Sequence, residues 1–240
     1  MAEQPELTPV PDRDLAPIAA LIGDPTRIAM LAALVEGRSL PAGDLARRAG
    51  VHPATASAHL RQLVDGGLVT VRAQGRHRYH ELAGPRVAAA VEALAQLAPP
   101  APVRSLRHAR AARSLTEART CYDHLAGRRG VQLRDRLLAA GALQPIDDRD
   151  HQLTATGCQL VAALGVDPEA LRRARRIFAR VCVDWTQRRP HLSGALPAAL
   201  TTQFLRLGWL SRATGRSLRA APDYDHRLDD WLSGAVRPTG

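Results

Sequence analysis

The spacing of apolar residues predicts three short helices in the first third of the chain. The first begins at Pro25, because Asp24 can cap a helix and proline is favoured at the first helical position. The second covers residues 40–48. The third starts at Pro53 and ends at a pair of glycines, and its apolar residues recur at helical spacing. The opposite face of this third helix therefore carries only small or hydrogen-bonding side chains.

Two strands are predicted directly after the third helix. Residues 68–72 and 76–82 flank a turn at Ala73-Gln74-Gly75, and arginines lie along the resulting hairpin. A helix with small side chains on its outer face can approach the edges of DNA bases in the major groove. A helix of this kind followed by a basic hairpin is typical of a winged helix-turn-helix.

The sequence GDPTRIAMLAAL, followed by LARRAGVHPATASAHLRQLVDGGLVTVRAQGRHRYHEL, resembles the ArsR/SmtB family of bacterial transcriptional repressors. The resemblance covers about residues 15–97, although the usual capping serine is replaced at position 52 by histidine. It implies a homodimer that binds double-stranded DNA with two-fold symmetry. It also implies that, when an effector binds, the dimer dissociates from the DNA or binds it in a different way. We expect the dimer interface to use residues 15–22 and 86–97. The resemblance assigns DNA contacts to His52, Thr55, Ser57, Ala58, Arg61, Arg72, Arg76 and Arg78.

Charge supports DNA binding over the alternative of a winged helix that binds only protein. Seven arginines lie between Arg47 and Arg86, against the acidic residues Asp65 and Glu81. Such a cluster can neutralise phosphates and release counterions. The net charge of the whole chain is +10, but all 33 basic residues are arginine and asparagine is absent, which reflects composition as much as function. The local cluster is therefore the stronger signal.

The length of 240 residues requires a second domain beyond the winged helix. Stacked prolines at 99–102 break the preceding helix, so we predict a tail at 1–14, a DNA-binding and dimerisation domain at 15–98, a Pro/Arg-rich linker at 99–113 and a regulatory domain at 114–240. The absence of a leader or a long apolar run predicts a cytoplasmic protein. Three widely spaced cysteines predict free thiols.

The pattern Leu-x-x-Gly-x-Leu occurs three times, at residues 63–68, 138–143 and 205–210. Each copy follows a helical stretch and precedes a short strand-like segment, so residues 114–164 and 194–232 are predicted to form winged-helix-like subunits. The acidic loop at 145–150 argues against DNA binding there. The predicted fold is mainly α with short β-hairpin wings: an N-terminal winged helix-turn-helix and a C-terminal helical domain.

Two metal sites known in the resembling family are missing from this chain. Residues 40–48 contain no Cys or His, and residues 86–97 offer only Glu92. A sensor must then lie in the second half, where two clusters stand out: Cys121 with His124, and Cys182 with His191.

We predict a helix that starts at the capping box of residues 114–117 and carries Cys121 and His124 on one face. A second helix, starting at Pro168 and ending before Pro190, would pass beside Cys182. If these helices pack together, Cys121, His124, Cys182 and His191 could form a tetrahedral thiolate and imidazole site for zinc, cadmium or another thiophilic divalent metal.

The sequence also allows other functions for the second half of the chain. An organic effector could bind in an aromatic-lined pocket of Tyr122, Phe178 and Trp185, or these rings could simply form a core. A Cys/His enzyme lacks an identifiable orienting group and oxyanion site, so no catalytic residue is assigned. An architectural DNA-binding protein without an effector is the remaining alternative. The sequence leaves the effector, the operator and the choice between repressor and activator open.

Overall fold

The computed structural model describes residues 14–35, 39–75, 77–99 and 105–234. Contacts divide the chain into two compact units. The first comprises residues 1–34 and 39–83, and the second comprises residues 35–38 and 84–240. Each unit has its own core, and each is described separately.

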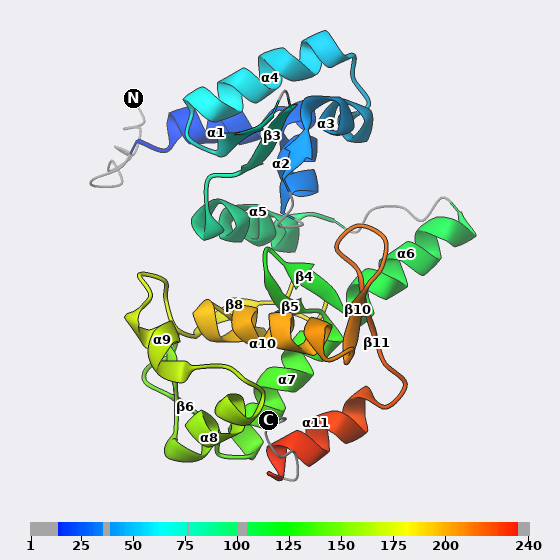
Figure 1. Cartoon of the computed structure of the whole chain (residues 1–240). Helices are drawn as coiled ribbons and strands as arrows, with labels where there is room; N and C mark the ends of the chain where they lie inside the picture. Colours follow the sequence, from blue (N-terminus) through cyan, green and yellow to red (C-terminus); the bar gives the residue numbers. More distant parts are fainter. Residues whose placement is uncertain (1–13, 36–38, 76, 100–104, 235–240) are drawn as a thin grey trace, which may run out of the picture. The chain divides into compact units, whose positions relative to one another are not determined.

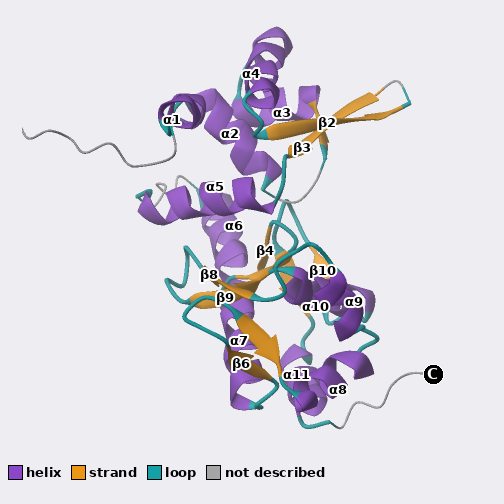
Figure 2. Cartoon of the chain, turned by 90° about the vertical axis from the view of Figure 1, so that its left-hand side faces the viewer, coloured by secondary structure: helices purple, strands orange, loops and turns teal. Residues whose placement is uncertain are grey.

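The first unit is a winged helix-turn-helix, as the sequence predicts. Its elements are α1 (Ala16–Ile22), α2 (Pro25–Leu34), β1 (Leu40–Pro41), α3 (Ala42–Ala49), α4 (Pro53–Asp65), β2 (Val69–Gln74) and β3 (His77–Leu82) (Figure 1). The three strands form one antiparallel sheet in the order β1-β3-β2. Figure 2 shows β2 and β3 projecting from the helices as a long hairpin. Met30, Leu31, Leu45, Leu60 and Leu63 are buried and hold the helices together.

The second unit alternates helices with two-stranded hairpins. Its helices are α5 (Pro85–Leu97), α6 (Leu106–Glu117), α7 (Arg128–Ala139), α8 (Ala155–Ala163), α9 (Pro168–Arg173), α10 (Ala195–Arg206) and α11 (Tyr224–Leu232). Its strands are β4 (Arg119–Cys121), β5 (His124–Ala126), β6 (Leu143–Pro145), β7 (His151–Leu153), β8 (Arg180–Val183), β9 (Pro190–Ser193), β10 (Leu210–Arg212) and β11 (Leu218–Ala220). The strands pair consecutively, as β4-β5, β6-β7, β8-β9 and β10-β11.

Two copies of one motif make up most of the second unit. The first repeat, β4-β5-α7-β6-β7-α8, is followed by the second, β8-β9-α10-β10-β11-α11, with only α9 between them. The two repeats form equivalent backbone hydrogen bonds with each other. In the first repeat, Thr120 N donates to Arg216 O at 2.9 Å, and in the second Val181 N donates to Arg149 O at 2.7 Å. Helix α7 contacts β9 while α10 contacts β5, so the two repeats are related by an approximate two-fold axis.

A glycine in the left-handed conformation follows a helix in both units. In the second unit it is the glycine of the Leu-x-x-Gly-x-Leu pattern, whereas in the first it is Gly67, one residue after the pattern's Gly66, whose φ is −80°. Gly67, Gly141 and Gly208 follow α4, α7 and α10, with φ of 70°, 63° and 70°. This left-handed conformation favours glycine, and each of the three leads into the first strand of a hairpin. The prediction of winged-helix-like subunits is thus confirmed. The second subunit begins earlier than expected, at β8 instead of residue 194.

Two predicted helices in the second half are wrong. Helix α6 ends at Glu117, so Cys121 and His124 lie on strands and not on one helical face. Helix α9 stops at Arg173, and β8 occupies the segment that carries Cys182. In both places hydrogen bonds to a partner strand outweigh the local helical pattern, and the β-branched Val181 and Val183 favour the strand.

The predicted linker and domain boundary also look different in the structure. Helix α6 covers part of the segment expected to be a Pro/Arg-rich linker. Contacts group α5 with the second unit, whereas the predicted N-terminal domain extends to residue 98. The physical reason is Glu92, a buried residue of α5 that pairs with Arg216.

Aromatic residues build the core of the second unit. Phe204 stacks on Trp209 with ring centroids 4.9 Å apart, and the rings of Tyr224 and Trp231 meet Phe204 edge-on. Trp231 Nε1 donates to Leu160 O at 2.7 Å. Because Leu160 belongs to α8 and Trp231 to α11, this bond ties the ends of the two repeats together.

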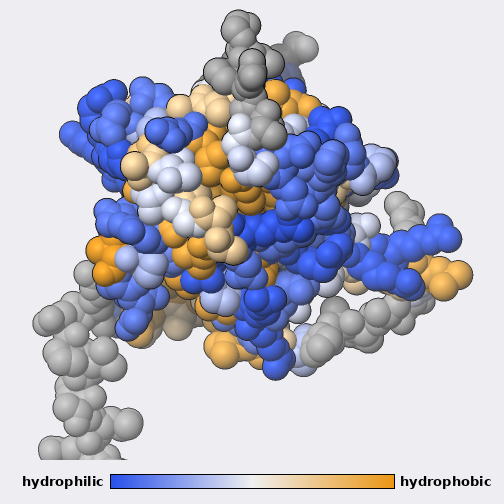
Figure 3. Space-filling view, turned by 90° about the horizontal axis from the view of Figure 1, so that it is seen from below, coloured by the Kyte–Doolittle hydropathy of each residue, from blue (hydrophilic) through white to orange (hydrophobic). Residues whose placement is uncertain are grey.

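Large apolar side chains that remain exposed are scattered over both units: Leu15, Ile18, Leu94, Leu97, Leu106, Ile146, Ile177 and Val183. On the face shown in Figure 3, apolar residues lie in patches between hydrophilic ones. Within the described ranges no single helix is long and apolar enough to cross a membrane. Helices α1 and α2 meet those criteria only as a pair bent by 84°, and α2 contributes four buried residues to the core.

We predict that Gly157→Ala destabilises the second unit. A Cβ at this position of α8 would lie 1.9 Å from Ala142 O, so the backbone would have to shift. The expected loss is about 1 to 3 kcal/mol of unfolding free energy. Denaturation followed by tryptophan fluorescence measures it, since all three tryptophans lie in the second unit. Gly43→Ala, where a Cβ meets nothing within 4 Å, should leave this curve unchanged. An unaltered curve for Gly157→Ala would contradict the packing described.

Candidate nucleic-acid interface and Cys/His centre

Helix α4 presents its predicted contact residues to solvent. Thr55, Ser57, Ala58 and Arg61 are all exposed, while Ala56, Leu60 and Leu63 are buried on the opposite face. His52 caps the helix with its ring, because Nδ1 accepts a hydrogen bond from Ala54 N at 3.4 Å. The outer face is therefore small, polar and accessible, as contact with base edges requires.

The wing, which follows α4 in the chain, carries positive charge. Arg72 and Arg78 are exposed on β2 and β3, where Arg72 pairs with Tyr79 and Arg78 pairs with Ala73. The predicted contact Arg76 lies outside the described residues. Exposed arginines on a projecting hairpin can reach phosphates or a groove without moving the core.

Arg27 fixes helix α4, a role that no motif in the sequence indicates. Its Nη1 donates to Gln62 Oε1 at 2.5 Å, and its Nε donates to Leu21 O at 2.6 Å. A single guanidinium thus links α1, α2 and α4. The geometry of the exposed face therefore depends on a residue that does not lie on it.

The four predicted sensor residues come together in the second unit. Cys121 lies opposite His124 in the β4-β5 hairpin, and Cys182 lies opposite His191 in the β8-β9 hairpin. One ligand atom from each of the four lies within 4.8 Å of all the others. The two imidazole Nε2 atoms are 3.2 Å apart. Each repeat therefore contributes one thiol and one imidazole to a shared centre.

The turn that joins Cys121 to His124 is conformationally strained. Tyr122 has a φ of 59°, an uncommon value for a bulky residue. Asp123 lies next to it in the turn and forms an ion pair with Arg176. The carboxylate Oδ1 of Asp123 also lies 3.5 Å from Nδ1 of His124. Strain of this kind persists where the surrounding structure holds the turn in place.

The surroundings shift the pKa values of the two thiols in opposite directions. The hydrogen bond with Cys182, together with burial, raises the pKa of Cys121 to about 12. The same hydrogen bond lowers the pKa of Cys182. Near neutral pH the Cys121 thiol therefore keeps its proton.

A buried ion pair holds the two ligand-bearing hairpins together. Arg119 Nη2 lies 2.9 Å from Asp184 Oδ2, and neither side chain is exposed. Asp184 also accepts from Gly127 N at 2.6 Å, from Thr186 and from Gln187. Burial opposes ionisation, but Arg119 and these hydrogen bonds hold the pKa of Asp184 at about 2. The sequence signal that could have revealed the pair is the repetition of Ala-Arg-x-Cys and Cys-x-Asp around Cys121 and Cys182.

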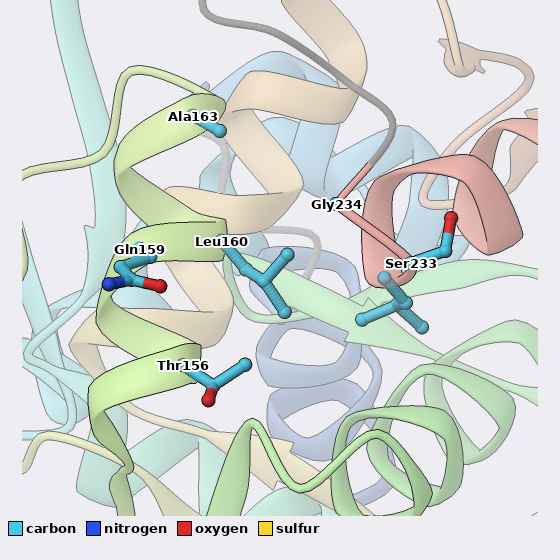
Figure 4. Close-up of a pocket in the computed structure, with 7 residues that line it drawn as sticks. Thr156, Gln159, Leu160, Ala163, Ser233 and Gly234 are labelled. Carbon is cyan, nitrogen blue, oxygen red and sulfur yellow. The ribbon is translucent and has the colours of Figure 1, made fainter.

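The three aromatic residues of the predicted organic-ligand pocket have different surroundings. The Trp185 ring lies beneath Arg119, at 4.8 Å, and Arg216, while the Phe178 ring lies beneath Arg172. Tyr122 occupies the strained turn. A cavity of about 260 Å³ lies elsewhere, between α8 and the end of α11 (Figure 4). Its lining consists of Thr156, Gln159, Leu160, Ala163, Leu232, Ser233 and Gly234.

Comparison with known proteins agrees with the first unit and extends into the second. A family model described as a helix-turn-helix domain matches residues 22–72. The uncharacterized HTH-type transcriptional regulator YdfF of Bacillus subtilis is 42% identical over 199 residues. This alignment covers 83% of the chain and 88% of YdfF.

Solved structures resemble a smaller part of the chain. The homodimeric winged helix-turn-helix domain of Mb0332 from Mycobacterium bovis, a possible ArsR-family regulator, is 30% identical with a TM-score of 0.33. It matches 40% of this chain and 88% of that one. The cadmium sensor CMTR from Mycobacterium tuberculosis is 32% identical with a TM-score of 0.31, and the match covers 39% of this chain and all of CMTR.

We predict that Arg61→Ala weakens binding to a DNA duplex selected by the protein from a random-sequence library. If Arg61 contacts a base, the loss is about 1 to 3 kcal/mol and is confined to the selected sequence. Fluorescence anisotropy on selected and scrambled duplexes separates this from a phosphate contact, which would weaken both equally. Arg206→Ala removes the same charge from an exposed position of the second unit and should leave both affinities unchanged. Unchanged binding by Arg61→Ala would contradict the assignment of α4 as the recognition helix.

Proposed function

This chain belongs to the family of HTH-type transcriptional regulators that includes YdfF, and from that premise we propose that it is a metal-responsive DNA-binding repressor. Its first unit is a winged helix-turn-helix of the ArsR/SmtB type. In this proposal the protein binds two-fold-symmetric DNA as a homodimer and releases it when a thiophilic divalent metal ion, such as zinc or cadmium, binds in the second unit.

A single observation carries the metal proposal: two thiols and two imidazoles from two hairpins lie within 4.8 Å of one another. Zn–S bonds of about 2.3 Å and Zn–N bonds of about 2.0 Å imply a tetrahedron with edges of roughly 3.3 to 3.8 Å. The separation of 3.2 Å between the two imidazole Nε2 atoms is already close to such an edge. The donor set fits the ion, because thiolates and imidazoles suit soft and borderline divalent metals.

The charge of the ligands and the position of Asp123 beside His124 also favour a thiophilic divalent metal. Two thiolates would neutralise a divalent cation, so a loaded centre would bury no net charge, whereas a hard ion such as magnesium prefers oxygen ligands. Asp123 lies behind Nδ1 of His124, 3.5 Å away, and carboxylates in this position orient metal-binding histidines. Cys121, His124 and His191 are buried, which keeps competing water away.

The proposed dimer would use exposed apolar residues on two helices. Leu15 and Ile18 at α1, and Leu94 and Leu97 on α5, are exposed although they are large and apolar. Covering such residues is a common driving force for association. Both helices belong to the segments that the sequence assigns to dimerisation.

We predict that Cys121→Ser lowers the affinity for Cd²⁺ by about 100-fold or more. Zinc-type centres are worth about 10 to 16 kcal/mol over four ligands, so losing one removes roughly a quarter of this. Competition titration with a chelator, together with thiolate-to-cadmium absorption in the ultraviolet, measures the effect on the full chain. Cys158→Ser is the matched control, because Cys158 is a free thiol outside the cluster and should not change the affinity.

Metal titration in the presence of the selected duplex tests whether metal binding controls DNA binding. Adding Cd²⁺ or Zn²⁺ to the wild-type protein should release the selected duplex, while Cys121→Ser should stay bound. If neither ion binds, or if both bind without changing DNA affinity, the metal-responsive function is wrong. The protein would then be a regulator without a metal effector.

We predict that metal affinity rises with pH. The pKa of Cys121 is raised to about 12, so its thiol is protonated near neutral pH and must lose its proton when a metal binds. Each proton released increases the apparent affinity tenfold per pH unit, and at least about tenfold is expected between pH 7 and pH 8. Calorimetry in buffers of different ionisation enthalpy counts the protons. A pH-independent affinity would exclude coordination by Cys121.

A further inference from the structure

Helix α5 contacts residues that lie next to the Cys/His centre. It starts at Pro85, shortly after the wing strand β3 ends at Leu82. Its carboxylate Glu92 is only 3% exposed and forms an ion pair with Arg216 of the second repeat. A buried carboxylate is costly unless it is paired, so this contact fixes α5 on the hairpin that holds Arg216.

Arg216 contacts β4, which carries Cys121, and the ring of Trp185, which lies just beyond β8. Its backbone O accepts from Thr120 N at 2.9 Å, next to Cys121 on β4. Its guanidinium lies 5.8 Å from the centroid of the Trp185 ring, three residues after Cys182. A shift of β4 therefore reaches Arg216 through a direct hydrogen bond, and a shift of β8 reaches it through the segment that carries Trp185.

A second contact joins α5 to the strand of Cys182. Gln96 Nε2 donates to Val183 O at 3.1 Å, and Val183 is the residue that follows Cys182 on β8. Helix α5 is thus held at two points, one through Arg216 and one at the end of β8.

The two-fold relation between the repeats provides an internal comparison. Arg149 is the counterpart of Arg216, since Arg149 O accepts from Val181 N as Arg216 O accepts from Thr120 N. Arg149 is exposed, and its hydrogen bonds in the described part of the chain do not involve α5. Helix α5 therefore contacts one of two positions that are equivalent in backbone hydrogen bonding.

We infer that Arg216 couples occupancy of the Cys/His centre to DNA binding, by transmitting the movement of the ligand hairpins to α5 through Glu92. The inference rests on the proposed metal-responsive function. An ion would draw the four ligand atoms from separations of up to 4.8 Å to tetrahedral edges of roughly 3.3 to 3.8 Å. Because this moves β4 and β8 toward each other, Arg216 and Val183 move with them and displace α5, which begins three residues after the wing strand β3 in the chain. A sensor works only through such a difference between states.

The test compares Arg216→Ala with Arg149→Ala in the full chain. Cd²⁺ affinity is measured by chelator competition, and affinity for the selected duplex is measured by anisotropy with and without Cd²⁺. We expect Arg216→Ala to keep its Cd²⁺ affinity within about threefold and to lose the response, so that Cd²⁺ changes DNA affinity less than twofold. Arg149→Ala should respond like the wild type. A normal Cd²⁺ affinity together with a lost DNA response indicates that Arg216 couples the two sites. A purely structural role of Arg216 would lower the Cd²⁺ affinity as well.

A second variant protects the test against misfolding. Arg216→Ala leaves Glu92 buried and unpaired, so the double variant Glu92→Gln with Arg216→Gln removes both charges while keeping hydrogen-bonding groups of similar size. It should also bind Cd²⁺ normally and fail to respond.

Four outcomes would overturn the inference. A wild-type response in the double variant or in Arg216→Ala excludes Arg216 as the coupling residue. Loss of the response in Arg149→Ala as well would mean that both hairpins matter equally. A Cd²⁺ affinity that falls together with the response would mark a structural role. Failure of the wild-type chain itself to bind or respond to Cd²⁺ would instead refute the proposed function, and the coupling with it.

Discussion

The buried ion pair between Arg119 and Asp184 determines how the second unit is built. Each residue lies two positions from a cysteine of the Cys/His centre, one on β4 and the other just beyond β8. Burying both charges costs several kcal/mol per ion, and the structure offsets this with backbone and hydroxyl donors to Asp184 and with Leu115 O as an acceptor for Arg119. Removing either partner would leave an uncompensated buried charge, at a cost of about 3 to 5 kcal/mol. The relative position of the two hairpins, and with it the convergence of the thiols, therefore depends on this pair.

The same residue types occur at the counterpart positions of the other repeat, where they pair differently. Arg180 forms an ion pair with Asp150, and Asp123 forms one with Arg176; all four are partly exposed. Partly exposed pairs of this kind contribute about 1 kcal/mol, whereas breaking the buried pair costs about 3 to 5 kcal/mol. Duplication thus supplies two similar hairpins, and only one junction between them is rigidly fixed. The repeats are symmetric in backbone hydrogen bonding but not in electrostatics.

Sequence periodicity is sufficient to predict the first unit, because its helices have apolar stripes and its wing has a clear turn signal. The repeated Leu-x-x-Gly-x-Leu turn is also predictable, since a left-handed residue after a helix favours glycine. The hairpins that carry the thiols cannot be predicted from the sequence in this way. Tyr122-Asp123 lacks the glycine or asparagine that marks a tight turn, and Cys182 falls on a stripe that looks helical from residue 171 onward. The four ligands converge as hypothesised, but through paired strands from two repeats and not through packed helices. Long-range pairing of this kind leaves no local pattern in a single sequence.

Glu92 shows how much a residue's role depends on such long-range pairing. From the sequence it is the one remaining candidate ligand on the helix after the wing. In the structure its carboxylate is buried against Arg216 and is committed to an ion pair. A metal ion bound there would have to displace Arg216 and expose the hairpin beneath it, so α5 is poorly suited to bind an ion. It is better suited to respond to one, because its fixed contacts lead to both cysteine strands while its first residue follows the wing. In the proposed function, sensing chemistry and DNA contacts reside in different units, and the buried carboxylate lies on the helix that follows the wing in the chain.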